Sequence, residues 1–272
     1  MASAPPSAEA GPAAATDPTP RPRRGSAART ALAAVLIGPF TLLVAGAHLL
    51  LSLVGAQRSR AALVLERVFC AGLLAMGGVR VRVHGAEHLE SGRGYVVMPN
   101  HRSWYDVPAL HVALGLRDVR WVSKREVVPI PVFGWAYGLS RHVAIDRGDR
   151  ESAVRAIRRA AEDGRGAASI VIFPEGTRSP DGGLLPFKKG GFHLALETGM
   201  PILPVAITGG ETVLPKRSWV IRPGVIDVTF LPPVQPGGVT RGEVPVLVSR
   251  VRESIRAALP GTRPTTTIQE SR

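Results

Sequence analysis

The chain has 272 residues, 45% of them hydrophobic and 20% charged, so it is long enough and apolar enough to build a large folded core. Its formal net charge of +13, mainly from arginine, favours an anionic partner: a nucleic acid, an acidic membrane surface or a phosphorylated small molecule. The sequence has no recognisable nucleic-acid module and few aromatic residues for base stacking, so we expect no nucleic-acid partner. Its one cysteine, Cys70, excludes an intramolecular disulfide, and its apolar neighbours predict a buried, unreactive thiol.

Residues 1–29 are rich in alanine, proline and small polar residues, which predicts a disordered tail with a basic end. The run from Ala31 to Ala56 then carries no formally charged residue. At about 1.5 Å per residue it exceeds a hydrocarbon core of roughly 30 Å, so it predicts a membrane-associated helix. Pro39 permits a kink, so the helix either spans the bilayer or dips into one leaflet. A signal peptide is the competing interpretation, but the apolar stretch is too long for one.

A second helix is predicted after Gln57, where apolar residues recur at helical spacing: Leu65, Val68, Phe69, Gly72, Leu73 and Met76. This stripe is compatible with packing on the first helix, docking on the rest of the chain, or lying in the membrane interface. Gly77-Gly78 predicts the end of the helix. We therefore divide the chain into a tail (1–29), a membrane-associated segment of two helices (30–78), a catalytic domain (79–260) and a loose C-terminal tail (261–272).

The remainder of the chain alternates strand patterns with helical ones. The strict alternation of valine with basic residues over 79–84 is the pattern of a half-buried strand, and the apolar run at 94–99 is that of a strand buried on both faces. Further strands are expected from 119 and at 142–146, 168–174, 201–207 and 225–230, with helices from the 101–106 turn to about 114, after 154, near 188–198 and at 242–258. This order predicts an α/β fold with a mixed, largely parallel sheet flanked by helices.

Three polar loops follow predicted strands: NHRSWYD at 100–106, DRGDR at 146–150 and EGTRS at 175–179. In sheets of this class, ligands bind beyond the carboxyl ends of the strands, so we expect these loops to share one rim. His101 and Asp106 are five residues apart, which separates them on a regular helix. If the turn precedes the helix that Asp106 begins, they can form a dyad, with the carboxylate orienting an imidazole that acts as general base. The alternative is an ordinary surface turn that Ser103 caps.

The other two loops supply groups suited to phosphate. Arg147 and Arg178 offer forked donors, and the backbone amides of Gly176 and Thr177 could add to them at a helix start. Solvated surface charges are the commoner outcome for single arginines, and for Lys188 as well. Glu175 has two interpretations, an acceptor for a substrate hydroxyl or an ion-pair partner that orients Arg178 or another basic side chain.

Two of these motifs resemble a known family. NHRSWYD matches the asparagine-histidine-x-serine-x-x-aspartate motif of the glycerolipid acyltransferases, and FPEGTRS matches their second motif, in the same order. The resemblance covers roughly residues 79–230. It is weaker around Arg147, where Ala144 replaces a larger family residue. It implies transfer of an acyl group from coenzyme A or acyl carrier protein to the free sn-2 hydroxyl of 1-acylglycerol 3-phosphate, giving phosphatidic acid in phospholipid biosynthesis.

His101 would then take the proton of the acceptor hydroxyl, Asp106 would hold the ring, and Arg147, Glu175, Gly176, Thr177 and Arg178 would bind substrate. Ser103 and Lys188 are further candidates, Ser103 or nearby backbone amides as oxyanion donors. We expect no metal and no resident cofactor. The expected partners are membrane lipids and the thioester donor, at the cell membrane with the catalytic domain on the cytoplasmic side.

Three alternatives stay open. The first is an acyltransferase of the same fold with another lysolipid acceptor. The second is a membrane-bound serine hydrolase with Ser103 as nucleophile, which the absence of a Gly-x-Ser-x-Gly elbow disfavours. The third is a catalytically silent lipid-binding protein.

Overall fold

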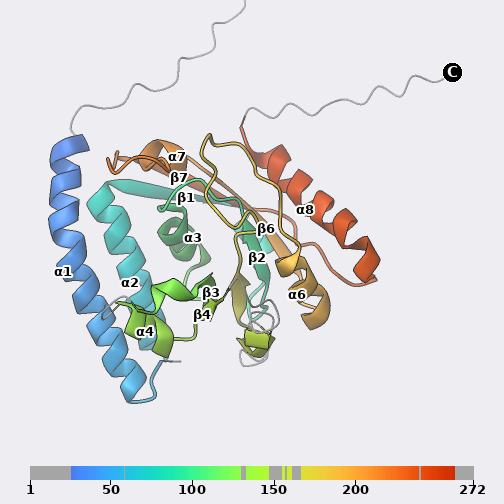
Figure 1. Cartoon of the computed structure of the whole chain (residues 1–272), viewed down its shortest axis with the longest axis horizontal. Coiled ribbons are helices and arrows are strands. Elements are labelled where there is room, and N and C mark those ends of the chain that lie inside the picture. The colour runs from blue at the N-terminus through green and yellow to red at the C-terminus, as the bar shows by residue number, and fades with distance from the viewer. Residues whose placement is uncertain are drawn as a thin grey trace, which may run out of the picture.

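The computed structural model describes residues 26–57, 59–129, 133–146, 155–156, 158–160, 167–238 and 240–260 (Figure 1). Most of the predicted N-terminal tail and all of the predicted C-terminal tail lie outside these residues. Residues 26–29, assigned to the tail from the sequence, instead form the first turn of α1.

Seven strands of the described chain form one sheet in the order β1-β7-β6-β2-β5-β3-β4. They are β1 (Val79–His84), β2 (Val96–Pro99), β3 (Val119–Lys124), β4 (Val143–Ile145), β5 (Ser169–Val171), β6 (Ile202–Thr208) and β7 (Gly224–Phe230). Neighbouring strands are parallel except β6 and β7, so β1 and β7 run against the others. The predicted mixed, largely parallel sheet is confirmed.

Helices cover both faces of the sheet (Figure 1). The α-helices are α1 (Ser26–Leu53), α2 (Arg60–Gly77), α3 (Asp106–Leu114), α4 (Phe133–Leu139), α6 (Gly190–Thr198), α7 (Gly210–Val213) and α8 (Val244–Ala258). Short 3-10 turns occupy Ala86–His88, Arg125–Val127 and Arg241–Glu243. One apolar core joins α2 and α3 to the sheet, and the other joins α6 and α8 to its opposite face. Strand β2 is buried throughout because it is covered on both sides, which explains its unbroken apolar sequence.

The two N-terminal helices pack against each other, with α1 on the outside (Figure 1). The Phe40 and Phe69 rings stack with centroids 5.9 Å apart, and a side chain at Gly72 would collide with Phe40. Part of the predicted α2 stripe therefore faces α1. Val68 does not, since it is 48% exposed.

The ends of α2 follow the sequence prediction. Ser59 Oγ accepts the N–H of Ala62, and Gly78 ends the helix in the left-handed region with φ of 66°. Cys70 is buried, and burial raises the pKa of its thiol to about 12, as expected for an unreactive cysteine.

The helices α4 and α7 were not predicted from the sequence. Strand β5 is shorter than the predicted strand at 168–174. Helix α4 packs against α1, so an element without a clear periodic pattern of its own forms through tertiary contact. The helix expected after residue 154 falls largely outside the described residues, although 155–156 and 158–160 are helical.

Candidate active site

The loop between β2 and α3 brings His101 and Asp106 together. Strand β2 ends at Pro99, the chain turns, and Asp106 is the first residue of α3. His101 Nδ1 lies 2.9 Å from Asp106 Oδ2. The convergence that the five-residue spacing permitted is therefore present.

Asp106 fixes the imidazole tautomer. Its carboxylate is buried, and Oδ2 also accepts the backbone N–H groups of Arg102 (2.6 Å) and Ser103 (2.7 Å). Because Oδ2 already accepts two backbone N–H groups, it also acts as the acceptor towards His101. The proton of the His–Asp contact therefore resides on Nδ1. The lone pair of His101 is then on Nε2, which has no hydrogen-bond partner among the described residues. This nitrogen is available to take a proton from a substrate.

Phe173 supports one face of the His101 ring. Its centroid lies 3.9 Å from that of His101 with an interplanar angle of 24°, and Trp121 stacks on Phe173 at 6.3 Å. Phe173 is the first residue of the FPEGTRS motif, but the sequence alone predicted no role for it. Phe173 follows shortly after the end of β5, where the predicted site residues of the EGTRS motif also lie. This position was the signal in the sequence that could have indicated a role in the site.

Glu175 accepts hydrogen bonds from two backbone groups and does not form the ion pair with Arg178 that was one of its two interpretations. It is buried, its Oε1 accepts the N–H of His101 at 2.7 Å, and its Oε2 accepts the N–H of Leu185 at 2.9 Å. Burial raises the pKa of Glu175 to about 7, although both backbone N–H groups act in the opposite direction. The carboxylate thus ties the loop at residues 100–106 to the segment after the EGTRS motif, and it forms no ion pair with Arg178 in the described structure.

The Arg178 guanidinium lies against the Trp104 ring and forms no ion pair with a carboxylate of the described chain. Its Cζ lies 4.4 Å from the ring centroid of Trp104, and no carboxylate of the described chain pairs with it. Partial burial lowers the pKa of Arg178, an effect opposed by the charge of Asp106. Lys216 brings a second cation to this loop, since its Nζ donates to the Arg178 carbonyl at 2.6 Å. An accessible guanidinium without an acidic partner is suited to bind an anion.

The remaining predicted phosphate ligands differ from expectation. Gly176, with φ of 70°, donates its N–H to the carbonyl of Phe173 at 3.0 Å, and no helix begins there. The predicted helix-start amide site is therefore wrong, because the segment forms turns and α6 begins only at Gly190. Thr177 is exposed, and the Lys188 side chain lies against Gly176. Arg147 lies outside the described residues.

Buried hydrogen bonds join the loop at residues 100–106 to β6 and to the segment after α7. Asn100, which the sequence did not single out beyond its place in the motif, bonds both backbone groups of Ile207 on β6 at 2.7 and 2.9 Å. The Ser103 hydroxyl is buried and donates to the carbonyl of Leu214 at 2.9 Å. A side chain at Gly210 would collide with Asp106, so the β6–α7 turn closes tightly over the dyad.

These contacts limit what the loop can offer a substrate. The N–H groups of residues 101–103 all donate to Glu175 or Asp106, and the Ser103 hydroxyl is engaged with Leu214. None of these groups is free to stabilise an oxyanion. The prediction that Ser103 or these amides act as oxyanion donors is therefore not supported. Among the described residues, no group of three or more histidine, cysteine or acidic side chains could hold a metal ion.

The chain resembles known acyltransferases in sequence and in structure. The family model described as Acyltransferase matches residues 80–208. The 1-acyl-sn-glycerol-3-phosphate acyltransferase of Limnanthes douglasii is 33% identical over 187 residues, which are 68% of this chain and 66% of that protein. The human 1-acyl-sn-glycerol-3-phosphate acyltransferase alpha is 36% identical over 183 residues, 65% of this chain and 63% of the relative. These matches span slightly less than two thirds of the relatives' length.

The structural comparison reaches further along the chain. The crystal structure of the 1-acyl-sn-glycerophosphate (LPA) acyltransferase PlsC from Thermotoga maritima superposes with a TM-score of 0.70 and 29% sequence identity. The superposition covers 85% of this chain and 93% of that chain.

Proposed function

We propose that the chain is an acyltransferase that transfers a fatty acyl group from an acyl thioester to the free sn-2 hydroxyl of 1-acylglycerol 3-phosphate, producing phosphatidic acid. The observation that carries this proposal is the His101–Asp106 hydrogen bond, which leaves the Nε2 lone pair of His101 free. The names of the relatives support the acceptor.

The dyad acts as a general base. Nε2 of His101 takes the proton of the acceptor hydroxyl as its oxygen attacks the thioester carbonyl, and Asp106 stabilises the imidazolium that forms. The tetrahedral intermediate then expels the thiolate, which receives the proton from Nε2. Proton transfer of this kind contributes roughly a hundredfold to ten-thousandfold in rate. The scheme uses no acyl-enzyme, no metal and no resident cofactor.

The phosphate of the acceptor binds at Arg178. Its guanidinium projects from the loop next to His101, held by the Trp104 ring and accompanied by Lys216. Lys188 and Arg147 are further candidates for the same phosphate or for the donor. The donor is an acyl thioester of coenzyme A or acyl carrier protein.

The reaction takes place at a membrane. Helix α1 is long and apolar enough to cross a bilayer, judged by its length and composition, and it stands beside the catalytic domain. The acceptor and product carry long acyl chains, so a site beside the bilayer avoids moving these chains through water. We place the protein at the cell membrane, with residues 79–260 forming the catalytic domain on the cytoplasmic side and residues 30–78 attaching it.

The test is acyl transfer by the purified chain in detergent, with a panel of acyl thioesters and lysolipids and product identification by mass spectrometry. We expect phosphatidic acid from 1-acylglycerol 3-phosphate, and a loss of roughly a hundredfold to ten-thousandfold in kcat for His101→Ala. Ser103→Ala separates the transferase from a serine hydrolase. A hydrolase would lose all turnover, whereas the transferase retains turnover in the folded fraction. Preference for another lysolipid would overturn the acceptor assignment alone.

A further inference from the structure

The loop between α7 and β7 carries the most exposed large apolar side chain of the described residues. Trp219 is 87% exposed, and its neighbour Val220 is also exposed. We propose that residues 215–222 form a second membrane-docking element, which inserts Trp219 into an anionic lipid surface next to the acceptor site. This inference rests on the membrane location proposed above.

The loop is tied to the N-terminal part of α1. The N–H of Ile221 donates to Thr30 Oγ1 at 3.0 Å, and the Thr30 hydroxyl lies 3.5 Å from the Ile221 carbonyl. In Figure 1 the orange segment that follows α7 reaches the end of α1 at which the N-terminal tail begins. The Trp219 loop therefore lies at the N-terminal end of the helix expected to meet the membrane.

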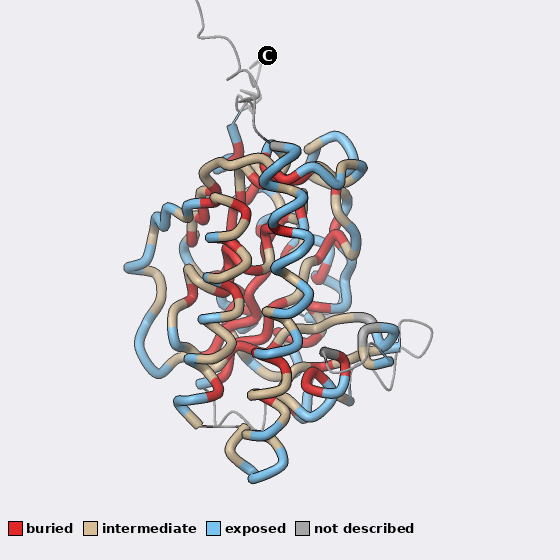
Figure 2. Tube along the Cα trace, turned by 90° about the vertical axis from the view of Figure 1, so that its left-hand side faces the viewer, coloured by how far each residue is buried: buried red, intermediate tan, exposed pale blue. Residues whose placement is uncertain are grey.

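From Leu32 to Leu53, the outer face of α1 is apolar. Ala33, Val44 and Ala45 on the opposite face are buried. The exposed large side chains recur at helical spacing and are Leu32, Val35, Leu36, Leu42, Leu43, Leu50 and Leu53. Figure 2, which views the molecule from this side, shows the exposed face along the helix with the buried core behind it. An exposed stripe of this length favours a lipid surface.

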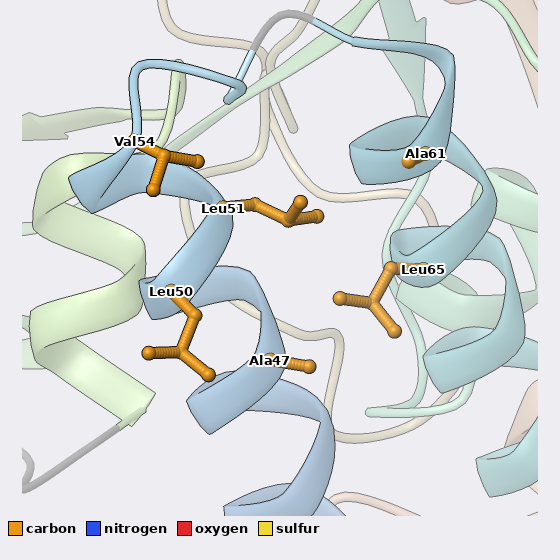
Figure 3. A pocket seen from close by; sticks show the side chains of 6 residues that line it. All are labelled: Ala47, Leu50, Leu51, Val54, Ala61 and Leu65. Atoms are coloured by element: carbon orange, nitrogen blue, oxygen red, sulfur yellow. The ribbon is translucent and has the colours of Figure 1, made fainter.

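The other end of α1 continues the apolar surface. An open groove of about 500 Å³ lies between α1 and α2, lined only by alanine, leucine and valine side chains (Figure 3). None of its lining residues belongs to the polar loops of the active site. The groove and the Trp219 loop lie at opposite ends of α1, with the exposed apolar side chains of the helix between them. The proposal therefore assigns the loop the same occupant as the helix, a lipid surface.

The charges of the loop match an anionic bilayer. Lys216, Arg217 and Arg222 flank Trp219, and the sequence from Val213 to Pro223 contains no acidic residue. A tryptophan ring prefers the boundary between headgroups and acyl chains, and each nearby cation adds attraction to anionic lipid. An exposed tryptophan flanked by basic side chains is characteristic of protein segments that bind anionic membranes.

The same loop touches the active site at its other end. Lys216 Nζ donates to the carbonyl of Arg178, and the carbonyl of Leu214 accepts the Ser103 hydroxyl. Insertion of Trp219 would therefore hold Arg178 near the depth of the lipid headgroups. An acceptor phosphate could then reach Arg178 while its acyl chain stays in the bilayer.

The test measures binding of the full chain to vesicles, independently of catalysis. With equimolar phosphatidylcholine and phosphatidylglycerol, we expect Trp219→Asp to weaken binding by about tenfold to a hundredfold, the effect of losing one buried aromatic side chain. Arg217→Gln should weaken binding to these vesicles by about fivefold but leave binding to pure phosphatidylcholine unchanged. Val246→Asp is the matched control, since Val246 is 68% exposed on α8, away from this loop.

A second measurement keeps the proposal falsifiable if Trp219→Asp fails to fold. Brominated lipid should quench the fluorescence of the wild-type chain more than that of Trp219→Phe. Equal quenching of the two, or equal vesicle binding by folded Trp219→Asp and Val246→Asp, would overturn the proposal. A wild-type dimer that Trp219→Asp dissociates with unchanged vesicle binding would overturn it as well, in favour of a second copy as the occupant. Acyl transfer in detergent, where no bilayer is present, tests the proposed function separately, and we expect Trp219→Asp to retain it.

Discussion

Two neighbouring loops of the active site differ in where their polar groups are directed. In the loop at residues 100–106, the side chains of Asn100, Ser103 and Asp106 are bound by groups of the protein itself. In the loop at residues 176–178, the Arg178 guanidinium contacts only an aromatic face among the described residues. If the proposed function is correct, the comparison indicates a division of labour, in which the proposed proton-transfer group is held rigidly and the proposed phosphate-binding group is left open for its ligand.

The strongest test of the rigid loop is Asp106→Asn. An amide cannot accept in the same way from His101 and two backbone N–H groups, so the imidazole loses its tautomer and orientation. We expect kcat to fall by roughly a hundredfold or more, with a much smaller change in KM. Steady-state kinetics in detergent and thermal melting measure the two effects.

Asp227→Asn is the matched control for this change. Asp227 also pairs with a histidine, His84, at 2.9 Å, but at the β1–β7 edge of the sheet. Its replacement should leave kcat unchanged. If the Asp106→Asn variant kept kcat within a few-fold of the wild type, the dyad would not be the catalytic base.

The open loop is tested by Arg178→Ala. Loss of charge-assisted hydrogen bonds to phosphate should raise KM for 1-acylglycerol 3-phosphate by about tenfold to a hundredfold, and Arg178→Lys should recover part of it. A monoacylglycerol acceptor, which lacks the phosphate, should be affected little. Arg250→Ala on α8 serves as a control for loss of one surface charge. An equal effect on both acceptors would remove Arg178 from phosphate binding.

Trp104 links the two loops and gives a smaller effect. Trp104→Ala removes the cation–π contact with Arg178, so we expect KM for the phosphorylated acceptor to rise about two- to fivefold. Trp104→Phe keeps an aromatic face and should retain most of the affinity. A drop in kcat with unchanged KM would instead assign Trp104 to the catalytic loop.

Glu175 should give the most modest effect, a change in the pH dependence of stability. Its pKa in the folded protein is about 7 against a reference of 4.5, so the folded state holds the proton more tightly. The stability contribution is complete below a pH of about 4.5 and is lost as the pH rises to about 7. Thermal melting across this interval should show wild-type stability declining relative to Glu175→Gln, which cannot titrate. Parallel profiles would contradict the shifted pKa.

Local patterns predicted much of the fold. The alternation at 79–84 matches β1, and the glycine pair after Met76 marks the end of α2. These features depend on residue spacing and on backbone conformations that neighbouring residues determine. The partners of Glu175 and Asn100 could not be predicted in the same way. Their hydrogen bonds join positions 74 and 107 residues apart, and a carboxylate or amide alone does not indicate which distant backbone group it will meet.

The sequence by itself determined which groups are available, an imidazole and a carboxylate at a strand-to-helix turn, arginine after a buried strand, and an apolar helix before them. The tertiary structure alone decided how each is used. It directed Glu175 to the backbone of His101, placed Arg178 on Trp104 and brought the Trp219 loop to α1. The physical reason is that composition and periodicity act over a few residues, whereas burial and hydrogen bonding select partners from the whole chain once the sheet order is set.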